Sequence, residues 1–564
     1  MSVAVAGEGV AVEAVRTALA DADEEVLTGL EALPDADLGV VVGLAGSDGF
    51  ERANALAVEA GVPWLAVEVG GVGGHPLAEV TASVAGFGPE AGCHRCLGLR
   101  VAAATDPEPV DPSAPRADVR FAGALAGREA TRALHGEAVA GSVVEVPGTR
   151  RTFLPVPDCP VCDAGRDRTL ERGFRDVDLD DAVSRVDAAV DPRVGLVTAV
   201  GERESYPTPY YLATLAATDG FSDAAVGEAA AGVDADWDRA YVKAVGEALE
   251  RYAAAVYRTD EFARGDVTDP VAPARFVRPD DAPADGDVAW VPGTDLHADE
   301  SVHLPAEFVH FPPPAETHRP AITTGLGLGN SVDEALRAGL TEVIERDATM
   351  LAWYSTYDPL GLTVDDEHFR SLAARARSED LTVTPVLVTQ DVDVPVVTVA
   401  VHREGEWPRF AVGSAADLDA GRAATRAAAE ALQNWMELRA MGPEAAAAES
   451  GAIGRYADFP EAARALVDPA ATVPAATVGP EAPPTGAAAV DALLDRVDAA
   501  GLSAYAARLT TRDVARLGFE AVRVLVPAAQ PLFVDEPYFG ERARTVPADL
   551  GFESRLDRPF HPYP

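Results

Sequence analysis

Hydrophobic and polar residues alternate in a regular rhythm over the first 70 residues of the chain. Short apolar runs, typical of buried strands, are separated by stretches in which apolar positions recur every three or four residues, as in amphipathic helices. The predicted elements are a strand at 2–6, a helix at 10–22, a strand at 39–43, a helix at 50–60 and a strand at 64–69. This order predicts an α/β domain with a small parallel sheet and crossover helices.

A glycine-rich turn follows the first predicted strand. Gly7-Glu-Gly9 supplies the first two glycines of a dinucleotide-binding fingerprint, but Val12 stands where the third is needed. The pattern therefore favours a tight strand-to-helix turn over a nucleotide site.

Two later stretches with helical periodicity each contain the pentapeptide Glu-x-x-Glu-Arg. The copies are Glu247-Ala-Leu-Glu250-Arg251 and Glu342-Val-Ile-Glu345-Arg346. At about 100° per residue, the two carboxylates of each copy gather on one face of the helix, with the arginine at their edge. Clustered carboxylates can hold a hard divalent cation and, through it, a nucleotide phosphate.

The same periodicity has a simpler explanation. Both acidic faces lie opposite apolar stripes, which is typical of any surface helix with a solvated charged face. Glu334 also fits a capping box that begins at Ser331. A third polar pair, Glu430 and Gln433, lies on a helix predicted at 425–438. Periodicity alone leaves both interpretations open.

Composition excludes several classes of partner. The chain has 564 residues, enough for two or three domains, and a formal net charge of −45. Such a charge would repel nucleic acid and anionic membranes. The acidic excess, high alanine content and scarcity of lysine are typical of a cytoplasmic protein from a halophile. The sequence contains neither an 18-residue apolar run nor a basic signal-peptide region at its start.

A single lysine stands among the 46 basic residues. It is Lys243, four residues before Glu247 on the carboxylate face of its predicted helix. An ammonium group is a compact point charge suited to a phosphate oxygen. A surface pair between Lys243 and Glu247 is the competing interpretation.

The four cysteines form two C-x-x-C hooks. The hooks are Cys93-His-Arg-Cys96 and Cys159-Pro-Val-Cys162. This spacing predicts a tetrathiolate zinc site, and a closed four-sulfur site is structural because it leaves no open coordination position. Redox-active pairs or unrelated thiols are the alternative.

The chain divides into three predicted segments. Residues 1–165 form the α/β domain with the cysteine hooks, 166–204 form an acidic linker, and 205–564 form a larger domain. Two segments of biased composition, near 265–320 and 441–486, are predicted to be surface excursions from that domain.

The larger domain resembles the YcaO family over about residues 205–564. The resemblance rests on motifs that occur in the family's order: Ala244-Val-Gly-Glu-Ala-Leu-Glu-Arg-Tyr252, Gly329-Asn-Ser-Val-Asp-Glu-Ala335, Glu342-Val-Ile-Glu-Arg-Asp347, Glu430-Ala-Leu-Gln433, Val524-Leu-Val-Pro527 and Gly540-Glu-Arg542. The proline-rich segment Pro559-Phe-His-Pro562-Tyr-Pro564 is similar to the tail of azoline-forming YcaO cyclodehydratases. The implied fold of this part is a large α+β YcaO domain.

The first domain resembles the E1-like partner of those cyclodehydratases. Gly88-Pro89, the hook at Cys93, Arg100 and the second hook carry this resemblance. It implies a shortened Rossmann-like, zinc-binding docking module, fused to the YcaO domain, that adenylates nothing itself.

The resemblance implies a site for ATP and Mg²⁺. Carboxylates would hold the metal, whereas arginine and asparagine would contact phosphates. The implied residues are Lys243, Glu247, Glu250, Asn330, Glu334, Glu342, Glu345, Arg346, Glu430 and Gln433. Three positions depart from the family pattern: Ala231 replaces a common lysine, Lys243 replaces serine, and Trp435 replaces arginine. We hypothesise that the ammonium group has moved from the loop to the helix.

The resemblance also implies a reaction. A Cys, Ser or Thr side chain of a ribosomally made peptide, such as a bacteriocin precursor, would cyclise onto the preceding amide with ATP as activator. Pro564, through a terminal carboxylate, or His561 would act as the base. The expected partners are the peptide, a separate protein that binds its leader or delivers sulfur, and a second copy in a homodimer.

Three alternatives stay open at this stage. The same ATP chemistry with external sulfide would give a backbone thioamide. A zinc-stabilised adaptor without catalytic activity would explain the departures at Ala231, Lys243 and Trp435. An activator of a carrier protein is disfavoured by the incomplete glycine motif and by the lack of a further cysteine.

Overall fold

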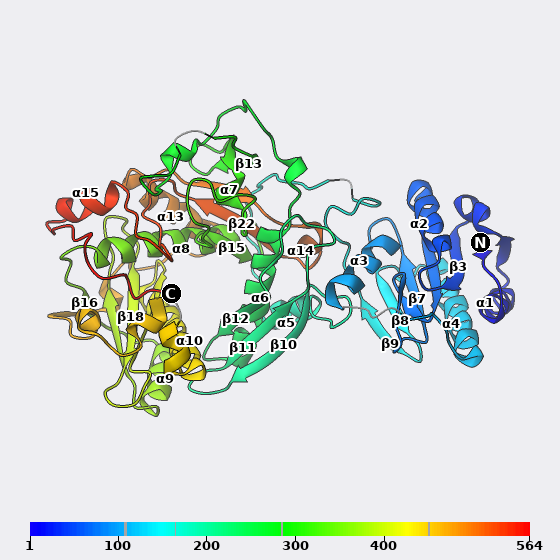
Figure 1. Ribbon diagram of the computed structural model, residues 1–564, viewed down its shortest axis with the longest axis horizontal. Coiled ribbons are helices and arrows are strands. Elements are labelled where there is room, and N and C mark those ends of the chain that lie inside the picture. Colours follow the sequence, from blue (N-terminus) through cyan, green and yellow to red (C-terminus); the bar gives the residue numbers. More distant parts are fainter. Residues whose placement is uncertain (106–109, 164, 284–285, 449–451) are drawn as a thin grey trace.

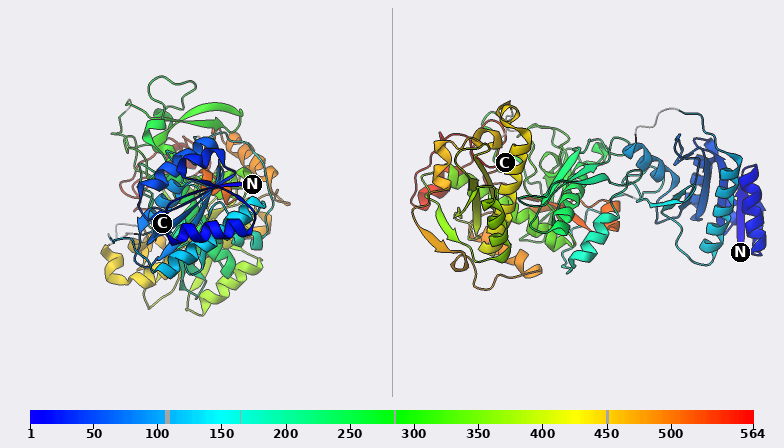
Figure 2. Two further views of the ribbon diagram at one scale, coloured as in Figure 1. Left: turned by 90° about the vertical axis from the view of Figure 1, so that its right-hand side faces the viewer. Right: turned by 90° about the horizontal axis from the view of Figure 1, so that it is seen from below.

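The protein is elongated, with the N-terminal domain at one end of a larger body (Figure 1; Figure 2, right). The computed structural model describes residues 1–105, 110–163, 165–283, 286–448 and 452–564. Among these residues, no helix combines the length and apolar character needed to cross a bilayer.

The five elements predicted at the start of the chain are confirmed. They are β1 (Ser2–Ala6), α1 (Val10–Asp21), β3 (Leu38–Leu44), α2 (Asp48–Ala60) and β4 (Trp64–Val69). Between them lies β2 (Glu25–Thr28), which the pattern missed because this strand is only four residues long and has two apolar residues. Alternate residues of the strands pack against α1 and α4 (Arg116–Leu134) on one face and against α2 on the other.

The sheet of this domain is parallel only in its first half. Its strand order is β2-β1-β3-β4-β7-β8-β9, and β2, β1, β3 and β4 run parallel. The strands β7 (Ala82–Phe87), β8 (Ser142–Glu145) and β9 (Thr149–Thr152) continue it antiparallel. The parallel sheet predicted from the first 70 residues is therefore confirmed, and the antiparallel half is built from strands that follow that stretch.

The acidic segment 166–204, predicted to be a linker, is structured. It holds α5 (Leu179–Asp187) and β10 (Val197–Glu204), and β10 pairs with β11 (Tyr210–Leu215). Asp178 caps α5 by accepting a hydrogen bond from the Asp181 N–H group. At least one acidic residue of this segment, Asp178, therefore has a structural role as a helix cap. Through β10 the segment is part of the larger body.

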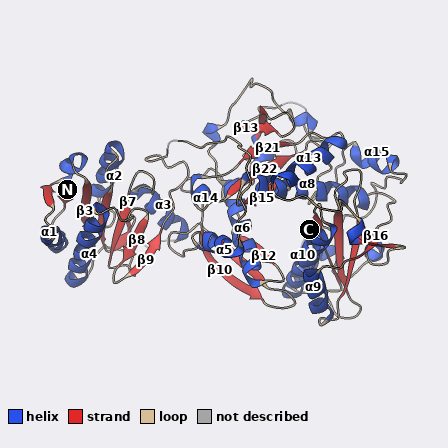
Figure 3. Cartoon of the chain, turned by 180° about the vertical axis from the view of Figure 1, so that it is seen from behind, coloured by secondary structure: helices blue, strands red, loops and turns tan. Residues whose placement is uncertain are grey.

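In the part of the chain that the structure describes, the larger body contains three sheets with helices packed on them (Figure 3). The first has the order β10-β11-β12, with β12 at Ala229–Val233. The second, β14-β13-β21-β22-β15, contains β14 (Glu300–Pro305), β13 (Trp290–Asp295), β21 (Tyr505–Arg508), β22 (Glu520–Leu525) and β15 (Leu326–Gly329). The third, β19-β18-β17-β16-β20, contains β19 (Phe410–Ala416), β18 (Val396–His402), β17 (Thr382–Leu387), β16 (Leu360–Thr363) and β20 (Thr472–Pro474).

Both segments of biased composition take part in these sheets. β13 and β14 lie within 265–320, and β20 lies within 441–486. The interpretation of the two segments as surface excursions alone is therefore wrong, because each supplies a strand.

The three helices that carry the acidic motifs are α6 (Trp237–Ala255), α8 (Val332–Trp353) and α10 (Ala420–Met441). Each packs on a different sheet: α6 on β12, α8 on β15 and α10 on β19. At each contact the strand presents a glycine to the helix backbone, namely Gly232, Gly327 and Gly413. A Cβ atom on Gly232 would lie 2.2 Å from Ala244 N, and one on Gly413 would lie 2.5 Å from Ala431 N. These glycines let the helices approach their strands closely.

We expect Gly413→Ala to lower the free energy of unfolding by about 1–3 kcal/mol, because the added methyl group overlaps the backbone of α10. Urea unfolding measures the effect. Gly201→Ala is the matched control, since Gly201 is also in a strand but a methyl group there would meet no neighbouring atom within 4 Å. Equal stabilities of the two variants would contradict the close-packing argument.

Candidate nucleotide site and cysteine centre

The acidic faces of α6, α8 and α10 turn toward one another and line two adjoining cavities, of about 610 and 650 Å³. The first cavity is lined by Lys243, Asn330 and Glu334, the second by Glu342, and both by Glu247, Glu250, Glu345, Arg346, Glu430 and Gln433. The structure thus brings together all ten residues predicted for ATP and Mg²⁺. Eight of these residues are buried or half-buried, so a solvated surface face does not describe them, whereas Lys243 and Glu334 are exposed as that alternative expects.

Enclosure in the cavities alters the acidity of the carboxylates. The pKa of Glu250 is raised to about 8 and the pKa of Glu345 to about 7, and burial is the largest cause of both shifts. Burial also raises the pKa values of Glu247, Glu342 and Glu430. Neighbouring carboxylates add to the effect, as Glu342 does for Glu250. A group of carboxylates that repel one another in this way is suited to bind a cation.

Backbone N–H groups hold three of the carboxylates in place. Glu247 accepts a hydrogen bond from Ala231 N at 3.2 Å, Glu342 from Gly325 N at 2.9 Å and Glu430 from Ser414 N at 2.7 Å. Each donor belongs to or adjoins the strand on which the helix packs. The strands therefore both support the helices and orient their carboxylates.

Arginines supply the positive charge inside the site. Arg346 lies 3.6 Å from Glu345 and 3.9 Å from Glu430, measured between charged atoms. Arg251 pairs with Glu247 at 2.5 Å across one helical turn. The charge of these guanidinium groups offsets only part of the carboxylate charge, and both types of group face space large enough for a ligand.

The start of α8 combines helix capping with the site. Ser331 is the N-cap, and its hydroxyl accepts from the Glu334 N–H group, as the capping box predicts. The Glu334 carboxylate accepts from Asn330, at 2.8 Å from the backbone N–H and 3.1 Å from the side-chain amide. Glu334 thus has the structural role and also lines the first cavity.

Lys243 lines the first cavity but does not pair with Glu247. Its ammonium group donates to Asp234 at 2.6 Å and to the Val233 carbonyl at 3.1 Å. Glu247 instead pairs with Arg251. The predicted surface pair is therefore wrong, whereas a phosphate contact of Lys243 stays a prediction.

Sequence reasoning missed several polar residues of the site, among them Arg426, Glu437 and Ser414. Arg426 lines both cavities, Glu437 lines the second, and the Ser414 hydroxyl donates to Glu345 at 2.7 Å. Arg426 stands one helical turn before Glu430, so the helical spacing that singled out Glu430 and Gln433 could have found it. Ser414 comes from a strand and gave no comparable signal.

Trp435 lies outside the site, in the core. It is fully buried, and its indole N–H donates to the Pro408 carbonyl at 3.1 Å. The guanidinium groups of Arg403 and Arg439 lie over its ring at 5.2 and 4.5 Å. Trp435, which departs from the family pattern, thus serves in packing. Arg426 supplies a guanidinium group to the cavities instead.

The two residues predicted to act as a base lie in different surroundings. Pro564 lines the second cavity, and its carbonyl oxygen accepts from Arg346 at 3.0 Å. His561 is buried outside both cavities, with Nε2 2.7 Å from the Phe533 carbonyl oxygen. The structure thus brings Pro564 to the carboxylates but leaves His561 in the core.

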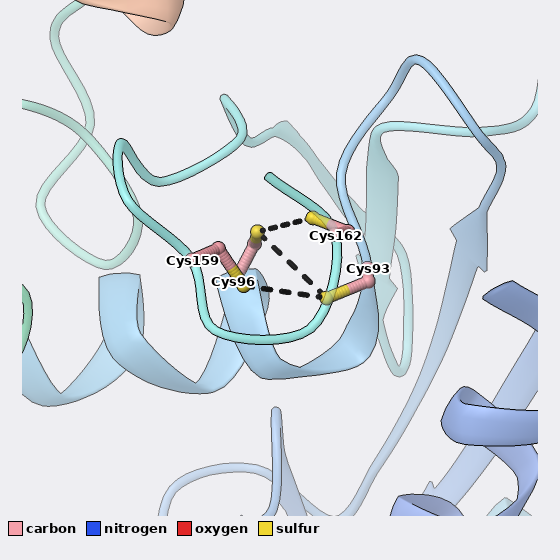
Figure 4. Close-up of side chains that lie close together, drawn as sticks. All are labelled: Cys93, Cys96, Cys159 and Cys162. Atoms are coloured by element: carbon pink, nitrogen blue, oxygen red, sulfur yellow. Dashed lines mark hydrogen bonds between the residues drawn. The ribbon is translucent and has the colours of Figure 1, made fainter. Parts of the chain in front are cut away.

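The four cysteines gather into one cluster, although the hooks are far apart in sequence (Figure 4). Their sulfur atoms all lie within 4.8 Å of one another. The separations are 3.8 Å from Cys93 to Cys96, 3.8 Å from Cys93 to Cys159 and 3.4 Å from Cys96 to Cys162. Tetrahedral ligands at about 2.3 Å from zinc would be separated by about 3.8 Å. The cluster is a possible metal site, and its thiols are free.

Residues 231–530, more than half of the chain, match the family model described as YcaO cyclodehydratase, ATP- and Mg²⁺-binding. The chain belongs to the YcaO family. This range contains the three acidic helices and thus all ten residues predicted for the nucleotide site.

Two solved structures are similar in fold over nearly the whole chain. One is a heterocyclase in complex with substrate and cofactor, with 19% identity and a TM-score of 0.74, covering 100% of this chain and 84% of that one. The other is the heterocyclase TruD, with 19% identity and a TM-score of 0.66, covering 98% and 82%. The likeness therefore includes the N-terminal domain as well as the YcaO domain.

A sequence relative matches a smaller part of the chain. It is an uncharacterized protein of Methanothermobacter thermautotrophicus, 35% identical over 127 residues. The match covers 22% of this chain and spans one third (33%) of that protein.

We expect His561 to make stability depend on pH. Burial lowers its pKa from 6.5 to about 4, so the unfolded chain binds a proton more readily than the folded one in this range. The free energy of unfolding should fall as pH falls from 6.5 to 4, by up to about 3 kcal/mol at about 1.4 kcal/mol per pKa unit. Denaturant unfolding of wild type and His561→Gln should show a smaller fall in the variant, and parallel curves would contradict a buried neutral role.

Proposed function

We propose that the protein binds Mg·ATP between α6, α8 and α10 and uses it to activate backbone amides of a peptide, forming azolines from Cys, Ser or Thr residues. One observation carries the proposal: glutamates from three separate helices converge, together with Arg346 and Arg426, on two adjoining cavities. Membership of a family described as ATP- and Mg²⁺-binding cyclodehydratases supports it.

The first cavity suits the nucleotide. Its wall includes apolar side chains, among them Val186, Val242 and Phe519, next to the polar groups of Lys243 and Asn330. Such a wall can cover a base while the polar groups contact phosphates. When bound, Mg²⁺ would neutralise charge on the phosphate oxygens. Glu247, Glu250, Glu342, Glu345 and Glu430 are the residues that would hold it.

The second cavity suits the peptide. It shares the carboxylates with the first cavity, and Pro564 lies at its wall. The substrate side chain would give its thiol or hydroxyl proton to a carboxylate of the site as it attacks the preceding carbonyl carbon. The resulting oxyanion would take the γ-phosphoryl group of ATP and release ADP. Loss of phosphate and of the amide proton would then complete the ring. The role of Pro564 as the base that accepts that proton stays a prediction; its oxygen accepts from Arg346 at 3.0 Å.

The N-terminal domain serves this function as a shortened E1-like docking module in our proposal. The full-length likeness in fold to the two heterocyclases supports this role. The cysteine cluster fits Zn²⁺ because it offers four thiol ligands at the separations of a tetrahedral site. A closed four-sulfur centre would stabilise the domain and would take no part in the chemistry. A leader-binding or sulfur-delivering partner and a homodimer stay predictions.

We expect Glu342→Gln and Glu345→Gln each to weaken Mg·ATP binding at least tenfold, because each removes a carboxylate charge from the walls of the two adjoining cavities. Isothermal titration calorimetry measures the affinity. Glu367→Gln is the control, since Glu367 is exposed at the start of α9 (Glu367–Arg377) and lines neither cavity. A folded wild type that binds no Mg·ATP would refute the nucleotide site and favour the adaptor function.

The product can be identified from mass. With a candidate precursor peptide, Mg·ATP and the required partner, we expect each modification to remove the mass of one water molecule and to release one phosphate. Mass spectrometry with a phosphate assay tests this. An exchange of oxygen for sulfur in the presence of a sulfide source would instead identify thioamide formation at the same site.

A further inference from the structure

Helix α6 has two opposite faces that serve different parts of the molecule. Glu247 and Glu250 face the cavities. Tyr252 lies about 200° around the helix from Glu250 and is buried on the side of the N-terminal domain. A displacement of α6 by contacts at the Tyr252 face would therefore also move the carboxylates of Glu247 and Glu250 on the opposite face.

Arg100 connects this second face of α6 to the cysteine centre. It lies one turn after Cys96 on α3 (His94–Ala104) and is fully buried. Its guanidinium group donates to the Tyr252 hydroxyl at 3.3 Å and pairs with Asp513, while the Tyr252 hydroxyl donates to Asp513 at 2.6 Å. Arg100 also donates to the Pro155 carbonyl at 3.2 Å, just before the second hook.

The second hook holds the same region through separate contacts. Arg512, next to Asp513 on α14 (Arg512–Arg516), donates to the Cys162 carbonyl at 3.3 Å and lies 3.6 Å from its sulfur atom. Four residues after that hook, Arg166 donates to the carbonyl of Val256 at the end of α6, at 2.7 Å. The second hook is thus bonded to Arg512 directly, and the first hook is linked to one end of α6 through Arg100 on the same helix α3.

Apolar packing makes this connection continuous. A single cluster of buried side chains includes three of the cysteines, residues of α6 and residues that follow α14. Its members include Cys93, Cys96, Cys159, Val101, Val245, Leu249, Tyr252, Leu517 and Phe519. Phe519 also lines the first cavity. The cysteine centre and the wall of the cavity therefore belong to one packed unit.

We propose that the cysteine centre, loaded with zinc, positions α6 for nucleotide binding through Arg100, Tyr252 and Asp513, so that zinc and Mg·ATP strengthen each other's binding. The proposal rests on the nucleotide site proposed above. Without the metal, the hooks lose the bonds that fix α3 and the loop before Cys159. Arg100 then loses its fixed partners on that side, and the carboxylates of α6 lose their alignment with those of α8 and α10.

Calorimetry on the full chain tests the coupling directly. We expect Mg·ATP to bind at least tenfold more weakly after zinc is removed with a chelator, with circular dichroism used to verify the fold. By linkage, Mg·ATP must raise the affinity for zinc by the same factor, measured by competition with a chromogenic chelator. A role of zinc that only stabilised the N-terminal domain would leave Mg·ATP affinity unchanged in the folded chain.

Two tyrosines on α6 provide matched variants that keep the metal. Tyr252→Phe removes the hydroxyl shared by Arg100 and Asp513, whereas Tyr241→Phe removes a hydroxyl bond to Asp187 about three turns earlier on α6. We expect Tyr252→Phe to retain zinc, weaken Mg·ATP binding about fivefold and reduce the coupling. Tyr241→Phe should leave the affinity for Mg·ATP and the coupling within about twofold of the wild-type values. These variants decide the matter if the zinc-free chain unfolds.

The outcomes distinguish a failure of this coupling from a failure of the proposed nucleotide site. Zinc-loaded wild type that binds no Mg·ATP would overturn the nucleotide site and the coupling together. Binding that is equal with and without zinc in a folded chain would overturn the coupling alone. So would Tyr252→Phe and Tyr241→Phe variants with equal affinities.

Discussion

Repulsion among buried carboxylates is the constraint on which the site depends. Glutamates from α6, α8 and α10 lie close together where little water can screen them, and burial raises their pKa values. Such an arrangement persists because the scaffold holds each helix firmly. Close strand–helix contacts at glycines, backbone N–H donors and Arg346 all act against the tendency of the charges to separate. The site is thus built to receive positive charge.

Much of this site could be predicted from the sequence because helical geometry is regular. Once Glu247 and Glu250 are on a helix, their common face follows from 100° per residue, and the same holds for Glu342 and Glu345. Cysteine spacing predicted the cluster for a similar reason, since two C-x-x-C hooks have few other uses. The resemblance to YcaO proteins then indicated that the separate faces meet, which no local pattern could show.

The features that were missed depend on contacts between distant segments. Ser414 reaches Glu345 across 69 positions, and Arg100 reaches Asp513 across 413. The strand β2 and the helix α5 were missed because both are short and have few apolar positions, two in β2 and four in α5. His561 was expected at the site from its place in a tail motif, but its ring packs against Phe533 and Phe560. Sequence position alone did not distinguish it from Pro564, which lines the cavity.

The apolar cluster shared by the cysteine centre and α6 also bears on how the chain can be divided. A boundary placed near residue 165 would separate Cys93 and Cys159 from Leu249 and Phe519, which pack in the same cluster. Either fragment would expose a broad apolar surface that is covered in the whole chain. The two parts follow one another in the sequence but share one packed core, so they do not fold as independent modules. Recombination that exchanged either part would therefore require this common core to be repacked.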